Sequence, residues 1–177
     1  MTIKSILQSL NITPKNTLFT LLFFTGLYLS VLEIELYRKT FIPLSIPLLI
    51  WILTGLFITP FFLKTLPDYL KTEIFIYQIA FNTITWGGIV TYLFMALNCY
   101  GARADNTSAT LIATGSGYLA KGRYGCGEPY KEVYYSGLNK VLIFPCGTTI
   151  EETNTVTITL NKGLFNYDVI VDQKLSK

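Results

Sequence analysis

The sequence predicts a membrane α plus small all-β protein, in which three transmembrane helices are followed by a C-terminal antiparallel β sandwich or partly open barrel of about five strands. Hydrophobic residues make up 51% of the chain and charged residues only 14%, whereas about a quarter of the residues of a typical soluble domain are charged. The three long apolar runs all lie before residue 98, and the remainder is polar or alternating. The two parts are therefore expected to face different solvents.

Three regions follow from this division. They are an interfacial amphipathic helix over residues 1–12, a three-helix transmembrane region over 13–103 and an extracytoplasmic β domain over 104–177. In the first region four apolar side chains share one helical face, a pattern typical of a helix that lies in the plane of a bilayer surface. These side chains are Ile3, Ile6, Leu7 and Leu10.

The first transmembrane span is expected over residues 14–37. Thr13 and Pro14 form a good start signal, because Thr is a favoured N-cap and Pro fits the first helical position. A helix of this length extends for about 36 Å, which is enough to cross a bilayer with some tilt.

The second and third spans are expected over residues 41–63 and 74–97, and neither run contains a charged residue. Pro43, Pro47 and Pro60 lie near the ends of the second run, where they leave its middle free to form a regular helix. Both runs are long enough to span a bilayer, and the short linkers between the spans favour antiparallel neighbours.

The β region is recognised by short runs rich in β-branched and aromatic residues, separated by Gly, Asn and Pro. Val156, Ile158 and Leu160 alternate with threonines, which is typical of a half-buried strand. Hairpins are expected at SGLN and at NKG. The five expected strands lie within ATLIATG, KEVYYSG, KVLIFP, TVTITL and FNYDVIVD.

Two of the three cysteines bracket the first hairpin. Cys126 precedes it and Cys146 follows it, so closing the hairpin should bring the two together. A disulfide there would close a loop of about 20 residues and stabilise the domain by about 3 kcal/mol. Two unpaired buried cysteines are an alternative, and a zinc site is disfavoured because the chain has no His and no further cysteine pair. Cys99, at the end of the third span, is expected to be buried.

Polar residues recur on one face of the third span. Gln78, Asn82 and Thr85 follow the helical spacing i, i+4 and i+7. An amide in hydrocarbon is costly unless it is paired, so this intramembrane polar face should look at another helix or at water. Three interpretations of this face remain open: a contact between helices of one chain, an interface between protomers, and a water-lined pore.

The orientation is inferred from basic residues and from the predicted disulfide. With the N-terminus inside, the cytoplasmic segments carry four basic residues and the outer segments near the membrane carry three, a small excess in the favoured sense. Disulfides persist mainly outside the cytosol. We therefore expect the N-terminus to be cytoplasmic and the C-terminal domain periplasmic or extracellular. The Ile-, Asn- and Lys-rich composition suggests a bacterial inner (plasma) membrane.

Several classes of function are disfavoured by composition. The chain has no His and no recognisable pair of nucleophile and base, so neither an enzyme nor a cofactor or metal site is expected. The net charge of +3 comes from residues 1–103, with 7 basic and 4 acidic side chains, while residues 104–177 hold 7 of each. Without a clustered basic surface, nucleic acid is not an expected partner.

The remaining interpretation is a non-enzymatic integral membrane interaction protein: a subunit, an assembly factor or an immunity-type partner. Its partners would be the lipid bilayer and another membrane or periplasmic protein, or a second copy of the chain. The alternative is a homo-oligomeric channel or transport accessory that uses the polar face of the third helix. Tyrosine is favoured at interfaces, and the candidate interface aromatics are Tyr118, Tyr124, Tyr130, Tyr134 and Tyr135.

Overall fold

The computed structural model of the chain describes residues 14–72, 74–120, 125, 127–150 and 154–176. The interfacial helix expected over residues 1–12 lies outside them. The chain forms two compact units, which we describe separately. The helical unit comprises the chain up to Glu33 together with Leu44–Phe94, and the β unit comprises Ile34–Pro43 together with Met95–Lys177.

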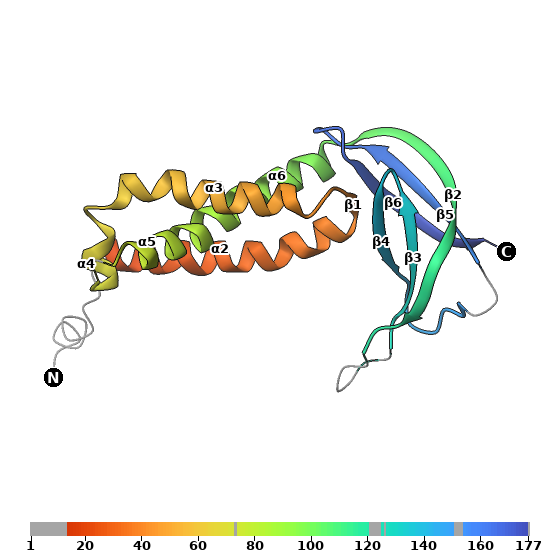
Figure 1. Cartoon of the computed structure of the whole chain (residues 1–177), viewed down its shortest axis with the longest axis horizontal. Coiled ribbons are helices and arrows are strands. Elements are labelled where there is room, and N and C mark those ends of the chain that lie inside the picture. The colour runs from red at the N-terminus through yellow and green to blue at the C-terminus, as the bar shows by residue number, and fades with distance from the viewer. Residues whose placement is uncertain (1–13, 73, 121–124, 126, 151–153, 177) are drawn as a thin grey trace. The chain divides into compact units, whose positions relative to one another are not determined.

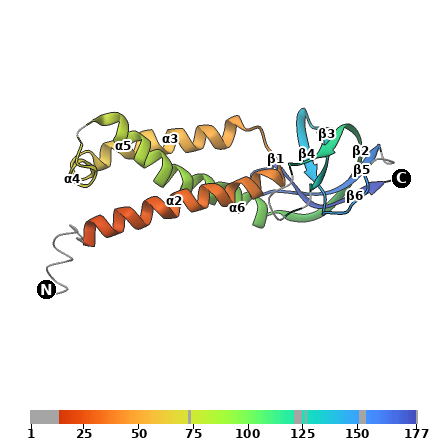
Figure 2. The ribbon, with the colours of Figure 1, turned by 90° about the horizontal axis from the view of Figure 1, so that it is seen from below.

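The three expected apolar helices are present, and each is long and apolar enough to cross a membrane. The third one is a continuous helix (Figure 2). It consists of two α-helical parts around a π-helical turn. A short helix, α4, precedes it. The helices are α2 (Pro14–Arg38), α3 (Ser45–Phe62), α4 (Leu66–Leu70), α5 (Phe75–Asn82), the π-helix η1 (Thr83–Gly87) and α6 (Gly88–Tyr100).

The second helix begins later than the sequence predicts. Instead of starting at residue 41, α3 starts at Ser45, because Thr40–Phe41 form a short strand, β1. Pro43 explains part of this difference, since a residue before proline is disfavoured in the α-helical conformation. The third helix ends at Tyr100, three residues beyond the predicted end.

Glycines set the distance between the helices of the helical unit. A β-carbon added at Gly26 of α2 would lie 2.7 Å from the Thr85 Cα, and one added at Gly55 of α3 would lie 2.6 Å from the Thr83 Cα. Both contacts are with η1, so the π-helical turn packs between α2 and α3 at backbone distance. Small residues permit such close approach where no hydrophobic driving force acts between helices.

An aromatic cluster packs the same unit near the first turns of α2. Phe19 contacts Phe62, Tyr69 and Phe81, with ring centroids 5.4–6.4 Å apart. The Thr20 and Tyr69 hydroxyls share a hydrogen bond of 2.9 Å. Leu66 of α4 is fully buried in this cluster, so α4 closes the end of the bundle.

The β unit is a six-stranded antiparallel sheet that curls into a nearly closed, barrel-like shape (Figure 1). The strand order is β1-β6-β5-β2-β3-β4. β2 is long enough to pair with β5 through its first half and with β3 through its second. The strands are β1 (Thr40–Phe41), β2 (Arg103–Tyr118), β3 (Pro129–Tyr135), β4 (Leu138–Ile143), β5 (Thr155–Lys162) and β6 (Asp168–Ser176).

Both predicted hairpins are present. β3 and β4 are joined by Ser136 and Gly137, whose φ angles of 50° and 84° are both positive. Two positive φ values are what a two-residue type I′ turn requires. The second hairpin pairs Lys162 with Asp168, so its loop, Gly163–Tyr167, comes later than the predicted NKG turn.

The core of the β unit is formed by alternate residues of the strands. Val156, Ile158 and Leu160 of β5 are at most 3% exposed, as their alternation with threonine predicts. Phe41 of β1 joins this core. β1 was not predicted, because two residues at the edge of an apolar run carry no periodicity of their own. It makes the sheet six-stranded where about five strands were expected.

Candidate functional site

The polar face of the third helix is buried inside the helical unit. Gln78, Asn82 and Thr85 are 3%, 1% and 0% exposed. The Asn82 Nδ2 donates a 3.1 Å hydrogen bond to the Thr59 Oγ1, which itself donates to the Gly55 carbonyl oxygen. Asn82 therefore packs against α3, and Thr85 packs against Gly26 of α2 in the same chain.

Three buried polar atoms in this unit have no hydrogen-bond partner among the described residues: the Gln78 Oε1, the Thr85 Oγ1 and the Trp51 Nε1. An unpaired buried polar group costs about 1–3 kcal/mol, and each one calls for an explanation. Thr85 lies in the π-helical turn, and such turns are frequent at functional sites. We find no physical account within the chain for why these atoms are left unpaired.

The candidate tyrosines fall into different environments. Tyr118 and Tyr134 are more than half exposed, while the Tyr135 ring packs 4.9 Å from the Phe41 ring. Tyr130 is half-buried and covers Gly117, where an added β-carbon would lie 2.8 Å from the tyrosine hydroxyl oxygen. Tyr124 lies outside the described residues. Tyr118 and Tyr134 thus have the exposure of surface aromatics, whereas the candidates Tyr130 and Tyr135 pack against other residues.

The cysteines are only partly covered by the structure. Cys146 is exposed in the turn that follows β4, and Cys126 lies outside the described residues, so their pairing stays a prediction. The sulfur of Cys99 is half-buried and lies 3.2 Å from the Thr40 hydroxyl oxygen. Thr40 also donates to the Leu36 carbonyl oxygen, which ties Cys99 to the end of α2 within the β unit.

The most distinctive site in the β unit is a cleft of about 490 Å³ where the barrel fails to close. We call it the seam. It lies between β4 and β6, beside the last residues of α2. The residues that line it are Glu35, Arg38, Lys39, Glu128, Val141, Leu142, Ile143, Ile170, Val171, Asp172 and Gln173.

The β4 side of the seam is an open strand edge. Among the described strands β4 pairs with β3 alone, and the Phe144 N–H donates to the Pro129 carbonyl oxygen. Backbone groups alternate in direction along a strand, so every second residue back from Phe144 faces β3. The residues between them, Asn139, Val141 and Ile143, direct their N–H and C=O groups away from β3, and Val141 and Ile143 line the seam.

Two side chains bridge the seam in place of a strand. The Lys140 Nζ donates to the carbonyl oxygens of Tyr37 and Thr40 and lies 3.9 Å from the centre of the Tyr37 ring. Further along, the Gln173 Nε2 donates to the Ile143 carbonyl oxygen. Burial lowers the pKa of Lys140 to about 8, because the charged ammonium has lost much of its water.

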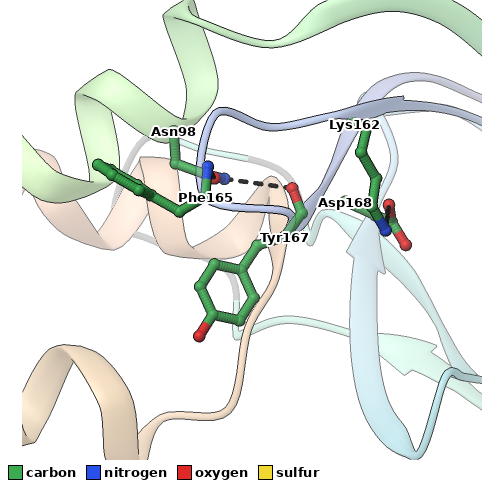
Figure 3. Close-up of polar contacts among 5 residues, drawn as sticks. All are labelled: Asn98, Lys162, Phe165, Tyr167 and Asp168. Carbon is green, nitrogen blue, oxygen red and sulfur yellow. Dashed lines mark hydrogen bonds and ion pairs between the residues drawn. The ribbon is translucent and has the colours of Figure 1, made fainter.

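At the base of the second hairpin, Asn98 of α6 holds the β5–β6 loop (Figure 3). Its Nδ2 donates to the Tyr167 carbonyl oxygen at 3.3 Å, and its Oδ1 accepts from the Phe165 N–H at 3.0 Å. The Lys162–Asp168 ion pair, at 2.9 Å, closes the ends of the two strands beside it. Sequence reasoning missed this role, because a single Asn at the end of an apolar run has no pattern.

Within the described residues, no three His, Cys, Asp or Glu side chains gather where they could hold a metal ion. Comparison of the chain with models of protein families, with curated proteins and with solved structures finds no match. The seam and the buried polar face are therefore interpreted from their own chemistry.

Proposed function

We propose that this protein is a non-enzymatic integral membrane interaction protein, whose β unit binds a partner protein outside the cytosol. The observation that carries the proposal is the seam. Natural sheets pair, shorten or cover their edges, because an open edge recruits other chains. A barrel whose described strands leave one cleft unpaired, with backbone groups directed into it, has the form of a binding site.

The helical unit supports the membrane part of the proposal. Large apolar side chains on α2 are well exposed, among them Leu21 at 61%, Phe24 at 60% and Tyr28 at 63%. An exposed apolar surface of this extent is unfavourable in water and is expected of a surface that contacts lipid. The proposed site of action is a bacterial plasma membrane, with the predicted Cys126–Cys146 disulfide stabilising the β unit on the outer side.

The alternative function, a homo-oligomeric channel or transport accessory, is favoured by one observation only, the three unpartnered polar atoms near the π-helical turn. It is disfavoured by the burial of Gln78, Asn82 and Thr85 against helices of the same chain. Ion flux through liposomes that contain the purified protein, abolished by Thr85→Val, would favour this alternative.

Site-specific crosslinking in native membranes tests the proposed function. A photoreactive amino acid is placed at Ile112, Tyr134 or Val141 of the β unit, which are 74%, 58% and 42% exposed, with Leu21 of α2 as the matched helical position. We expect a defined protein adduct from at least one β position and lipid adducts from Leu21. Lipid adducts alone from every position, with a monomer in native mass spectrometry, would contradict the proposal.

A further inference from the structure

We infer that the seam binds an extended segment of the partner protein as an added β-strand, antiparallel to both β4 and β6. This inference rests on the proposed function and specifies its binding site. It further specifies the polarity of the segment: an amino-terminal or basic end beside Glu128, and a carboxyl-terminal or acidic end beside Arg38 and Lys39.

The direction of the added strand follows from the order of the sheet. From β6 through β5, β2 and β3 to β4, each strand is antiparallel to the next. Four reversals return the chain to its original direction, so β6 and β4 run parallel to each other. Only a strand opposite in direction to both would complete an all-antiparallel barrel, and antiparallel pairing is slightly more stable per residue than parallel pairing.

β1 already occupies this position in the ring for two residues. Thr40 pairs with Val169 and Phe41 with Asp168, and the Ile170 N–H donates to the Lys39 carbonyl oxygen. Before Lys39 the chain is helical, so β1 does not continue alongside Val171 and Gln173. An added strand would run in line with β1, and its last residue would lie next to Lys39.

The seam is wide enough that a side chain is needed to bridge it. Paired strands lie about 4.8 Å apart, with direct backbone hydrogen bonds between them. Here the whole Gln173 side chain spans from β6 to the Ile143 carbonyl oxygen. A strand of three or four residues, about 10–13 Å long, would match Val141–Ile143 on one side and Val171–Gln173 on the other.

The charges around the seam agree with the required direction. Glu35, Arg38 and Lys39 line the end near β1 and sum to +1, whereas Glu128 lines the other end and Asp172 lies on β6 between Val171 and Gln173. The Asp172 carboxylate also forms an ion pair with Lys174, whose Nζ lies 2.7 Å from the Asp172 Oδ2. Glu128 precedes Pro129, whose carbonyl oxygen is bonded to Phe144, which places it beyond Ile143. A strand antiparallel to β4 and β6 begins at this acidic end and finishes at the basic one, so the backbone direction and the charges select the same peptide polarity.

In strand addition, main-chain hydrogen bonds supply affinity and side-chain contacts supply specificity.

Peptide binding to the full-length protein in lipid nanodiscs tests the inference. The probes are two labelled hexapeptides with the same Val-Thr-Val-Thr centre, one running from Lys to a free carboxyl-terminal Glu and the other from Glu to an amidated Lys. We expect the first to bind at least tenfold more tightly by fluorescence anisotropy. Methylation of alternate backbone nitrogens of the peptide should abolish its binding.

Two variants locate the binding at the seam. Val141→Pro removes an N–H that faces the seam and leaves the β3–β4 ladder intact, so it should weaken peptide binding at least tenfold with little change in the thermal unfolding midpoint. Gln173→Ala frees the Ile143 carbonyl oxygen and should tighten binding several-fold, which keeps the test informative if Val141→Pro does not fold.

The contrary outcomes are distinct. The inference would be overturned if neither peptide bound at millimolar concentration. It would also be overturned if both bound equally and neither variant changed their affinity. A dimer in native mass spectrometry that Val141→Pro dissolves would overturn it in favour of pairing between two copies. If the peptides fail while Ile112 or Tyr134 still crosslinks to a defined protein, the proposed function stands and the seam is not its site.

Discussion

At the scale of single residues, Lys140 gives the clearest prediction, because it is a cation only 7% exposed whose described hydrogen-bond acceptors are neutral carbonyl groups. Its pKa is about 8 in the folded protein and near 10.5 when unfolded. The unfolded chain therefore binds more protons between these values, so folding is penalised below pH 8 and the penalty is relieved as the pH rises to 10.5. We expect the free energy of unfolding to gain on the order of 1 kcal/mol over this range, since solvent screens part of the shift.

The measurement is urea unfolding of the protein in detergent from pH 7.5 to 10, followed by circular dichroism. Lys140→Met lacks the titrating group and should lack this rise, whereas Lys64→Met, at an exposed position in the turn between α3 and α4, should keep it. The same rise in Lys140→Met would assign it to groups other than Lys140. Tyr135 is not such a group, because burial and the nearby Asp168 raise its pKa, and a tyrosine with a raised pKa makes the folded protein less stable as the pH rises.

Asn98 supports a second prediction at this scale. Asn98→Ala removes the donor to Tyr167 and the acceptor for Phe165, and we expect a loss of about 2 kcal/mol of stability. Asn98→Asp keeps the acceptor and should lose less. Differential scanning calorimetry distinguishes the two, and equal unfolding temperatures for all three proteins would mean that the loop is held by other contacts.

At the scale of elements, two residues on the buried polar face of the third helix share the same helical pattern in the sequence but differ in their hydrogen bonds. Asn82→Leu breaks the bond to Thr59 and should cost about 0.6–1 kcal/mol. Gln78→Leu instead removes an oxygen that has no partner, so it should be neutral or stabilising. Thermal unfolding in detergent measures both. Equal destabilisation by the two changes would contradict these contacts.

Side-chain periodicity predicts some of the elements of this fold and misses others. The three apolar helices, the Ser136–Gly137 turn and the core positions of β5 follow from composition and from the alternation of side chains. β1 and the seam do not, because they depend on which distant strand Thr40 and Phe41 join. The π-helical turn could not be predicted either, because its close contacts with Gly26 and Gly55 come from two helices distant in the sequence.

At the scale of the whole molecule, the predicted disulfide and the predicted orientation depend on each other. If Cys126 and Cys146 are joined, thiol titration of the unfolded, unreduced protein should find one free cysteine per chain, Cys99. Reduction should then lower the free energy of unfolding of the β unit by about 3 kcal/mol. A count of three free thiols would remove the disulfide and weaken the argument for an outer location.

Orientation can be tested without reference to the disulfide. Three membrane spans would place the two ends of the described chain on opposite sides of a bilayer, and the excess of basic residues near the membrane, four against three, favours a cytoplasmic N-terminus. We expect alkaline phosphatase fused after Lys177 to be active in a bacterial host, because it folds only outside the cytosol, where its own disulfides can form. The matched control is a fusion after Lys71, in the segment between the second and third spans, which should be inactive. Activity after Lys71 together with inactivity after Lys177 would invert the orientation, and the partner that binds the seam would then have to be sought in the cytosol.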